Sequence, residues 1–364
     1  MNDPSAAPRA ETAAGTSARK RRWPPPWWVQ VSVSLLVVTL SVWLVLVPQL
    51  PDGERSVNAL RGMSIPLAVV ALLLEALSVV SYSLLTALVF TRRTSSFLTL
   101  LRIDLSGLGA SHVLPAGGAT STALRVRLLH LSGATPNEAL TGVAVQATAS
   151  YLALGCLFVA GVVLSISSGG GLAGAGVGVI TVVVLIAGTV FGAFQLSRRP
   201  DGPVRWARAL GRRLPWVREE AAGAVVRGLS GRVSDLIHHP RRMSSVLLVA
   251  ALHWLLDAAV LWVMLAAFGQ ALSVGPLLLV YGLGNILAIL PLAPGGLGIV
   301  EGAMLPALVA FGVLSPAALF GVLGWRLLRF WMPIPVAALA YAWLRLGPLR
   351  LGAGAADAPH RRSR

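Results

Sequence analysis

Ionisable side chains occur inside long apolar stretches of this sequence, where charge is unusual. Placing one at the centre of a lipid bilayer costs about 3 kcal/mol on insertion scales, so such residues usually face a polar interior that serves an ion, a proton or a polar ligand. The candidates are Glu75, Asp104, Arg125, Arg127, His253, Asp257, Glu301, Arg326 and Arg329. We therefore expect a polar site within the membrane.

The arginines of this set suit a phosphate-bearing group, because the planar guanidinium donates to phosphate through a bidentate fork. Arg326 and Arg329 are three positions apart and share one helix face, so they can add a second grip to that of Arg125 and Arg127. A pairing of Glu301 with Arg125 or Arg127 across a cavity is one alternative. The structural alternative is that Arg125 and Arg127 extend to the cytoplasmic interface while nearby acids neutralise the later pair.

His253 and Asp257 are four positions apart, so they also share a helix face. This spacing fits either a proton relay or a helix-stabilising hydrogen bond. The chain has no metal-ligand motif, phosphate-binding loop, dinucleotide fingerprint or nucleophile–base spacing. We accordingly expect no metal, no cofactor and no catalytic residue.

The elements that position these side chains are expected to be membrane helices. Hydrophobic residues make up 55% of the 364 residues and charged residues 12%, against about 25% charged in soluble domains. Apolar windows long enough to cross a ~30 Å hydrocarbon core lie at 29–47, 67–90, 137–166, 172–196, 245–268 and 317–344. The sequence predicts an all-α, polytopic membrane protein with about six full spans.

The net charge of +16 is distributed between and beside the apolar windows rather than in one basic domain. Such a distribution is typical of the positive-inside rule and argues against a nucleic-acid partner. It predicts a disordered cytoplasmic tail at 1–24, a basic cytoplasmic loop at 197–243 and a cytoplasmic tail at 346–364, in the cell (inner) membrane. Both termini are then cytoplasmic.

Two further segments, 97–131 and 274–311, are interrupted by glycine and proline. Backbone groups freed at membrane depth are tolerated only where protein or a water-filled cavity satisfies them, so we expect two re-entrant hairpins around a cavity. The alternative is that these residues only allow close helix packing. The binding residues expected in the breaks are Pro115, Gly117, Gly118, Pro294, Gly295 and Gly296.

The two broken segments resemble one another. Gly107-Leu108-Gly109, Leu114-Pro115 and Gly117-Gly118 recur in order as Gly282-Leu283-Gly284, Leu290-Pro291 and Gly295-Gly296, and 139–143 match 318–322 without gaps. The charge-based topology inserts the hairpins from opposite sides, which is the inverted-repeat plan of many transporters. We expect a membrane domain at 25–345, with halves at about 65–166 and 244–345 joined by the span at 172–196 and the basic loop.

Two motifs carry a family resemblance. Leu290-Pro-Leu-Ala-Pro-Gly-Gly-Leu-Gly-Ile-Val-Glu301-Gly and Trp325-Arg-Leu-Leu-Arg-Phe-Trp-Met-Pro333 resemble the lysylphosphatidylglycerol synthase/flippase transmembrane domain family. Leu114-Pro-Ala-Gly-Gly and Arg125-Val-Arg-Leu-Leu look like the first-half counterpart. The resemblance implies translocation of a lipid, whereas in fused members a separate soluble domain synthesises that lipid. With about 20 residues after the last span, we expect no such synthase activity here.

The leading hypothesis is a lipid or lipid-linked-substrate flippase that moves an anionic or zwitterionic headgroup, with a phospholipid or polyprenyl-linked lipid as the partner. Arg125, Arg127, Glu301, Arg326 and Arg329 would form the headgroup path. One rival is a membrane transferase with Asp104 or Glu301 as general base. The other is an accessory subunit that docks an envelope-lipid biosynthetic enzyme through residues 198–242, and a homo-oligomer also stays open.

The topology gives the first testable prediction. Residues near Asp52 and Gly169 should react with membrane-impermeant thiol reagents from outside after substitution by cysteine, whereas Ser234→Cys should react only after permeabilisation. Labelling of Ser234→Cys in intact cells would refute the cytoplasmic assignment and with it the inverted repeat.

Overall fold

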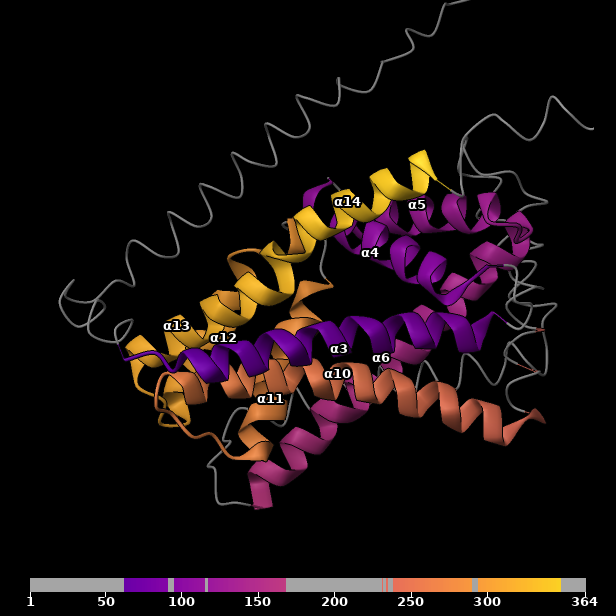
Figure 1. The fold of residues 1–364 in the computed structure, drawn as a ribbon. Helices are drawn as coiled ribbons and strands as arrows, with labels where there is room; N and C mark the ends of the chain where they lie inside the picture. Colours follow the sequence, from indigo (N-terminus) through magenta and orange to yellow (C-terminus); the bar gives the residue numbers. More distant parts are fainter. Residues whose placement is uncertain are drawn as a thin grey trace, which may run out of the picture.

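The computed structural model describes residues 62–90, 95–114, 117–167, 231, 234, 238–289 and 294–347. Within these ranges the fold is all-α, as predicted (Figure 1). The tail at 1–24, the spans at 29–47 and 172–196, and most of the basic loop and the C-terminal tail lie outside the described residues.

Four helices of the described chain are long and apolar enough to cross a membrane. They are α3 (Ile65–Val89), α6 (Pro136–Ser167), α10 (Pro240–Ala267) and the continuous run of α13 (Ser315–Arg326), the π-helical turn η3 (Leu327–Trp331) and α14 (Pro333–Leu346). Even the 25 residues of α3 extend for about 37 Å, which exceeds a ~30 Å hydrocarbon core. These helices coincide with the windows expected at 67–90, 137–166, 245–268 and 317–344.

Helices α3 and α10 lie side by side and antiparallel through the middle of the bundle (Figure 1). At one end the backbone N–H of Ser64 donates to the carbonyl of Ala267 at 2.9 Å. At the other end the guanidinium of Arg242 donates to the carbonyl of Leu88 at 3.1 Å. The C-terminal ends of the two helices therefore point in opposite directions.

Each central helix leads into a pair of short helices. After α3 come α4 (Phe97–Val113) and α5 (Gly117–Leu131), and after α10 come α11 (Val274–Ala288), the 3₁₀ turn η2 (Pro294–Gly296) and α12 (Ile299–Ala310). The members of each pair pack on one another. Since α3 and α10 are antiparallel, the two hairpins start from opposite ends of the bundle, as an inverted repeat requires.

The halves are joined by reciprocal packing, because α4 packs on α14 and α11 packs on α6. Glycine allows both contacts. A Cβ on Gly109 would overlap the Cβ of Ala337 on α14, and one on Gly282 would overlap the side chain of Phe158 on α6. The repeated Gly-Leu-Gly motif therefore includes a close-packing position in each half. This agrees with the alternative that such glycines allow helices to pack closely.

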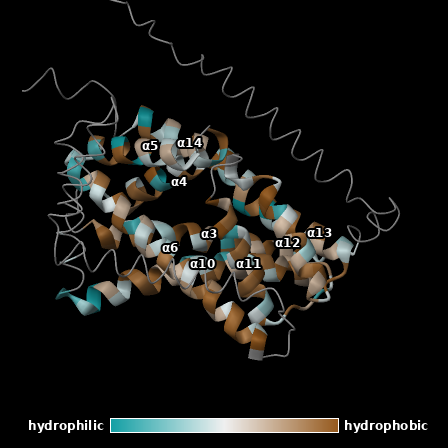
Figure 2. Ribbon diagram, turned by 180° about the vertical axis from the view of Figure 1, so that it is seen from behind, coloured by the Kyte–Doolittle hydropathy of each residue, from teal (hydrophilic) through white to brown (hydrophobic). Residues whose placement is uncertain are grey.

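Apolar side chains cover the outer faces of the two central helices. Leu73, Leu77 and Leu84 of α3 and Leu248 and Leu252 of α10 are all exposed. Figure 2 shows apolar residues along most of the helices, with hydrophilic residues gathered toward the end of the bundle that carries α5. This distribution is that of a body surrounded by lipid, because no water is available to drive these leucines inward.

The α4–α14 contact can be tested through Gly109. Gly109→Ala should lower the stability of the folded protein by about 1–3 kcal/mol through overpacking, although alanine raises intrinsic helix propensity by about 1 kcal/mol. Gly302→Ala on α12 is the matched control, because nothing lies within 4 Å of the added Cβ. Thermal unfolding in detergent should therefore separate the two variants, and equal midpoints would contradict the described packing.

Candidate functional site

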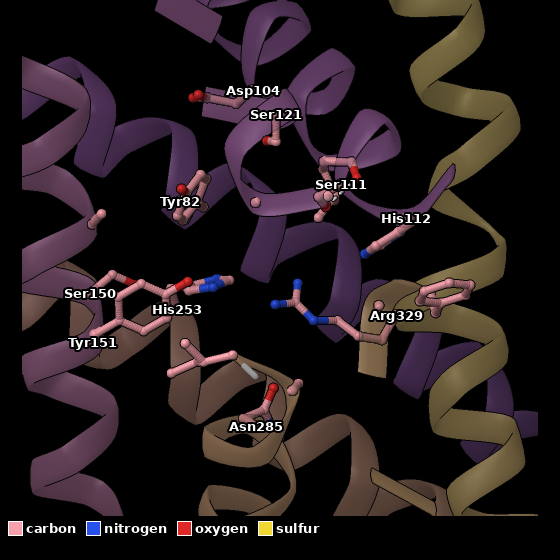
Figure 3. Close-up of a pocket in the computed structure, with 18 of the residues that line it drawn as sticks. Tyr82, Asp104, Ser111, His112, Ser121, Ser150, Tyr151, His253, Asn285 and Arg329 are labelled. Carbon is pink, nitrogen blue, oxygen red and sulfur yellow. Dashed lines mark hydrogen bonds between the residues drawn. The ribbon is translucent and has the colours of Figure 1, made fainter. Parts of the chain in front are cut away.

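A cavity of about 720 Å³ lies between the two hairpins. Side chains from both halves line it, including Tyr82 on α3, Arg125 on α5, His253 on α10 and Asn285 on α11. Figure 3 shows His253, Tyr151 and Arg329 directed toward a common space. Three arginines contribute to the wall: Arg125, Arg326 and Arg329.

Arg125 on α5 is held by groups from three other helices. Its Nη2 donates to Asp104 Oδ1 on α4 at 2.6 Å and to Gln146 Oε1 on α6 at 2.5 Å, and its Nη1 donates to the Tyr82 hydroxyl on α3 at 3.2 Å. Asp104 also accepts a hydrogen bond from Thr86 at 2.7 Å. This network fixes the first hairpin against α3 and α6 and leaves Arg125 buried.

Arg326 at the end of α13 holds the glycine-rich turn of the second hairpin. Its Nη1 and Nη2 donate to the carbonyls of Gly295 at 3.1 Å and Gly296 at 3.2 Å. Its Nε lies 2.6 Å from Glu301 Oε1, an ion pair in which the N–H is not aligned for a hydrogen bond. The other Glu301 oxygen accepts from the backbone N–H of Gly298 at 2.7 Å, at the N-terminus of α12.

The turn held by Arg326 needs glycine for its backbone. Gly295 and Gly296 have φ values of 59° and 68°, in the left-handed region that costs other residues about 1–2 kcal/mol. A Cβ on Gly295 would also overlap the Phe330 ring. The turn therefore depends on glycine both for its conformation and for its approach to η3.

Arg329 lies in η3, where the helix widens by one residue. The N–H of Met332 donates to the carbonyl of Leu327 at 2.8 Å, an i to i−5 bond. Pro333 follows and has no N–H to donate to the carbonyl of Arg329, which favours the wider turn. The Arg329 side chain lies over α10, where its Nε is 3.0 Å from Asp257 Oδ2, while its Nη1 is 3.6 Å from Glu75 Oε1 on α3.

His253 and Asp257 do not form the pair expected from their spacing. His253 Nδ1 lies 3.1 Å from the Ser78 carbonyl, which can only accept, so Nδ1 carries the proton. Asp257 instead accepts from Tyr281 at 2.6 Å and Trp325 at 2.9 Å, besides its ion pair with Arg329. Spacing identified the face of α10 correctly, but the partners come from α3, α11 and α13.

The cavity contains six of the residues predicted as binding residues: Gly117, Gly118, Arg125, Gly295, Arg326 and Arg329. Glu301 lies behind Arg326 as its counter-ion rather than meeting Arg125. Arg127 is exposed on α5 and does not line the cavity. Gly296 is buried beside Ala288, Pro294 begins η2, and Pro115 lies outside the described residues.

Sequence reasoning missed the uncharged polar lining. Gln146 on α6 is fully buried and contacts Arg125 and Thr86, while Ser150, Tyr151, Asn285 and His112 line the cavity. A buried amide in an apolar window needs hydrogen-bond partners, so Gln146 was the signal that could have been used. Within the described part of the chain, no cluster of three possible metal ligands was found.

Comparisons with known proteins identify what this architecture resembles. A family model described as "Lysylphosphatidylglycerol synthase TM region" matches residues 27–337. Two curated relatives, each a UPF0104 membrane protein of Methanothermobacter thermautotrophicus (strain Delta H), share shorter stretches. One is 30% identical over 135 residues, 35% of this chain and 40% of the relative. The other is 32% identical over 95 residues, 26% of this chain and 28% of the relative. The chain thus matches less than half the length of either relative.

The Arg125 network predicts a non-additive response. Asp104→Asn should destabilise the protein by about 3–5 kcal/mol, because it leaves a buried guanidinium without its counter-charge. Replacing both partners, as in Asp104→Leu with Arg125→Met, should recover much of that loss. Thermal unfolding of the purified variants measures both effects, and a double variant no more stable than Asp104→Asn would contradict the coupling of the two charges.

Proposed function

The chain belongs to the lysylphosphatidylglycerol synthase transmembrane-region family, and from that premise we propose that it moves a phosphate-bearing lipid headgroup between the leaflets of its membrane. The cavity between the two hairpins is the path of the headgroup. The acyl chains stay in the surrounding bilayer, along the apolar outer faces of the helices.

The observation that carries the proposal is the set of three arginines in the cavity wall. Arg125 comes from the first half, and Arg326 and Arg329 come from the second, so a headgroup between them contacts both halves at once. Guanidinium groups bind phosphate oxygens through paired hydrogen bonds. Movement of one half against the other would then open the site to one leaflet or the other, as in alternating access.

Charge balance narrows the class of headgroup. Arg125, Arg326 and Arg329 each have an acidic partner within 3.0 Å. The cavity is therefore far from an uncompensated cationic pocket, which would hold a polyanion tightly and release it slowly. A singly anionic or zwitterionic phospholipid headgroup fits this balance best.

The engagement of the acids favours transport over lipid transfer chemistry. Asp104 accepts hydrogen bonds from Thr86 and Arg125, and Glu301 caps α12 while it pairs with Arg326. A general base needs an oxygen free to take a proton from the substrate. Both carboxylates instead act as fixed counter-ions, a role suited to positioning arginines.

The direct test uses purified protein in liposomes with a fluorescent phosphatidylglycerol that a membrane-impermeant reagent quenches from outside. The wild-type protein should expose lipid from the inner leaflet at a rate at least about tenfold above protein-free liposomes, which corresponds to about 1.4 kcal/mol of barrier. Mass spectrometry of the recovered lipid should find it chemically unchanged. A covalently altered lipid would support the alternative of a membrane transferase. No movement of lipid would contradict the proposal and favour an accessory subunit that docks another enzyme.

Glu301 tests whether the charged cavity wall serves transport. Glu301→Gln keeps an oxygen for the α12 cap but removes the charge that holds Arg326, so the rate should fall by roughly tenfold or more, and by much more than the yield of folded protein falls. Exchange of the two charges in Arg326→Glu with Glu301→Arg should restore part of the rate.

Arg127→Gln is the matched control, because Arg127 carries the same charge on α5 but is exposed outside the cavity. Its rate should equal that of the wild-type protein. Equal losses of yield and rate in Glu301→Gln would give Glu301 a structural role only. A slow Arg127→Gln would move the headgroup path to the outer face of α5.

A further inference from the structure

The buried charges in the cavity wall and directly behind it do not cancel. Three arginines each have a close carboxylate: Arg125 with Asp104, Arg326 with Glu301 and Arg329 with Asp257. A fourth acid, Glu75 on α3, has only a 3.6 Å contact with Arg329. With every group ionised, the described cluster therefore carries one negative charge more than positive.

Glu75 and Asp257 approach the same arginine but differ in their bonding. Asp257 has donors at both oxygens, from Tyr281 and Trp325, in addition to Arg329. Glu75 is 1% exposed, and within the described chain neither of its side-chain oxygens has a hydrogen-bond partner. Asp257 thus has close partners at both oxygens, whereas Glu75 has only its 3.6 Å contact with Arg329.

A buried carboxylate with no hydrogen bond and no dedicated counter-ion is one of the most unfavourable groups a membrane protein can hold. Binding one proton removes that charge and makes the cluster neutral. We propose that Glu75 is a proton-binding site, and that it takes up a proton together with the anionic headgroup at Arg329. This inference rests on the proposed function for the identity of the anion.

The coupling follows from the position of Arg329 between the two acids and the cavity. Figure 3 shows its guanidinium extending into the cavity, whose wall it helps to form. When Glu75 is ionised, two acids surround one guanidinium and repel an approaching phosphate. When Glu75 is protonated, a neutral Arg329–Asp257 pair remains and can donate to it. Linkage is reciprocal, so the phosphate must also favour the proton.

The other charged and titratable groups around Glu75 do not supply the missing counter-charge. Helix α3 packs against α10, α4, α6 and η3. These elements bring His253 and Asp257 from α10, Asp104 from α4, Tyr151 from α6 and Arg329 from η3, with Tyr281 of α11 behind Asp257. His253 bonds Ser78, and Asp104 meets Thr86, about three helical turns along α3 from Glu75.

The proton site can be tested without any transport assay. Infrared spectra of the protein purified in dodecyl maltoside, a detergent without a carbonyl group, should contain the C=O stretching band of a protonated carboxylic acid near neutral pH, and Glu75→Gln should abolish it. Glu301→Gln is the matched control, because it removes a buried glutamate that has a close ion pair, and should leave the band in place. A band that survives in Glu75→Gln, or its absence from the wild-type protein, overturns the assignment.

The coupling requires a second measurement, on protein reconstituted in liposomes. Movement of fluorescent phosphatidylglycerol by the wild-type protein should change by at least about fivefold when a pH gradient is imposed, the lower range of ordinary coupling between sites. Glu75→Gln should move lipid at a rate that ignores the gradient.

The two measurements separate the two proposals. Wild-type protein that moves no lipid but has the Glu75 band would refute the proposed function and keep the proton site. Wild-type movement that ignores the gradient, or a Glu75→Gln variant that still responds to it, would refute the coupling.

Discussion

Charge in a medium without water must be compensated from within the protein, and this constraint organises the described structure. A guanidinium or carboxylate at membrane depth is not solvated by water, so each one requires a partner on another segment. Arg125 and Asp104 join α5 to α4, Arg326 and Glu301 join α13 to α12, and Arg329 joins η3 to α10 and approaches α3.

These pairs hold polar side chains at the place where both hairpins are interrupted. A hairpin broken by glycine exposes backbone carbonyls, and Arg326 uses the carbonyls of Gly295 and Gly296 as acceptors. The break therefore supplies acceptors for the N–H groups of Arg326, and Arg326 supplies donors for the carbonyls that the break leaves unpaired. The apolar exterior and the polar cavity are two results of one requirement, since charges that cannot reach the surface collect around a shared interior space.

The helical architecture could be predicted from the sequence because hydrophobic length and glycine–proline interruptions are local signals. The windows at 67–90 and 245–268 became α3 and α10, and the interruptions near Gly117 and Gly295 separate the helices of each hairpin.

For the site, the sequence predicted which residues take part but not how they pair. The sequence identified the buried ionisable residues, but Arg329 meets Glu75 across 254 positions of chain, and no spacing rule specifies such a partner. His253 and Asp257 make the same point, because a shared helix face does not determine what lies opposite it. Arg127, two positions from Arg125, points elsewhere, since two residues of an α-helix correspond to about 200° of rotation.

The widened turn at Leu327–Trp331 also divides one long helix into two rotational phases. Before it, α13 packs on α10; after it, α14 packs on α4 of the other half. One residue of an α-helix corresponds to about 100° of rotation, so the extra residue in the turn sets which side of α14 carries Ala337 toward Gly109. The turn therefore sets the rotation of α14 relative to α13. A chain that lost one residue there would still span the membrane, but α14 would present the wrong face to α4.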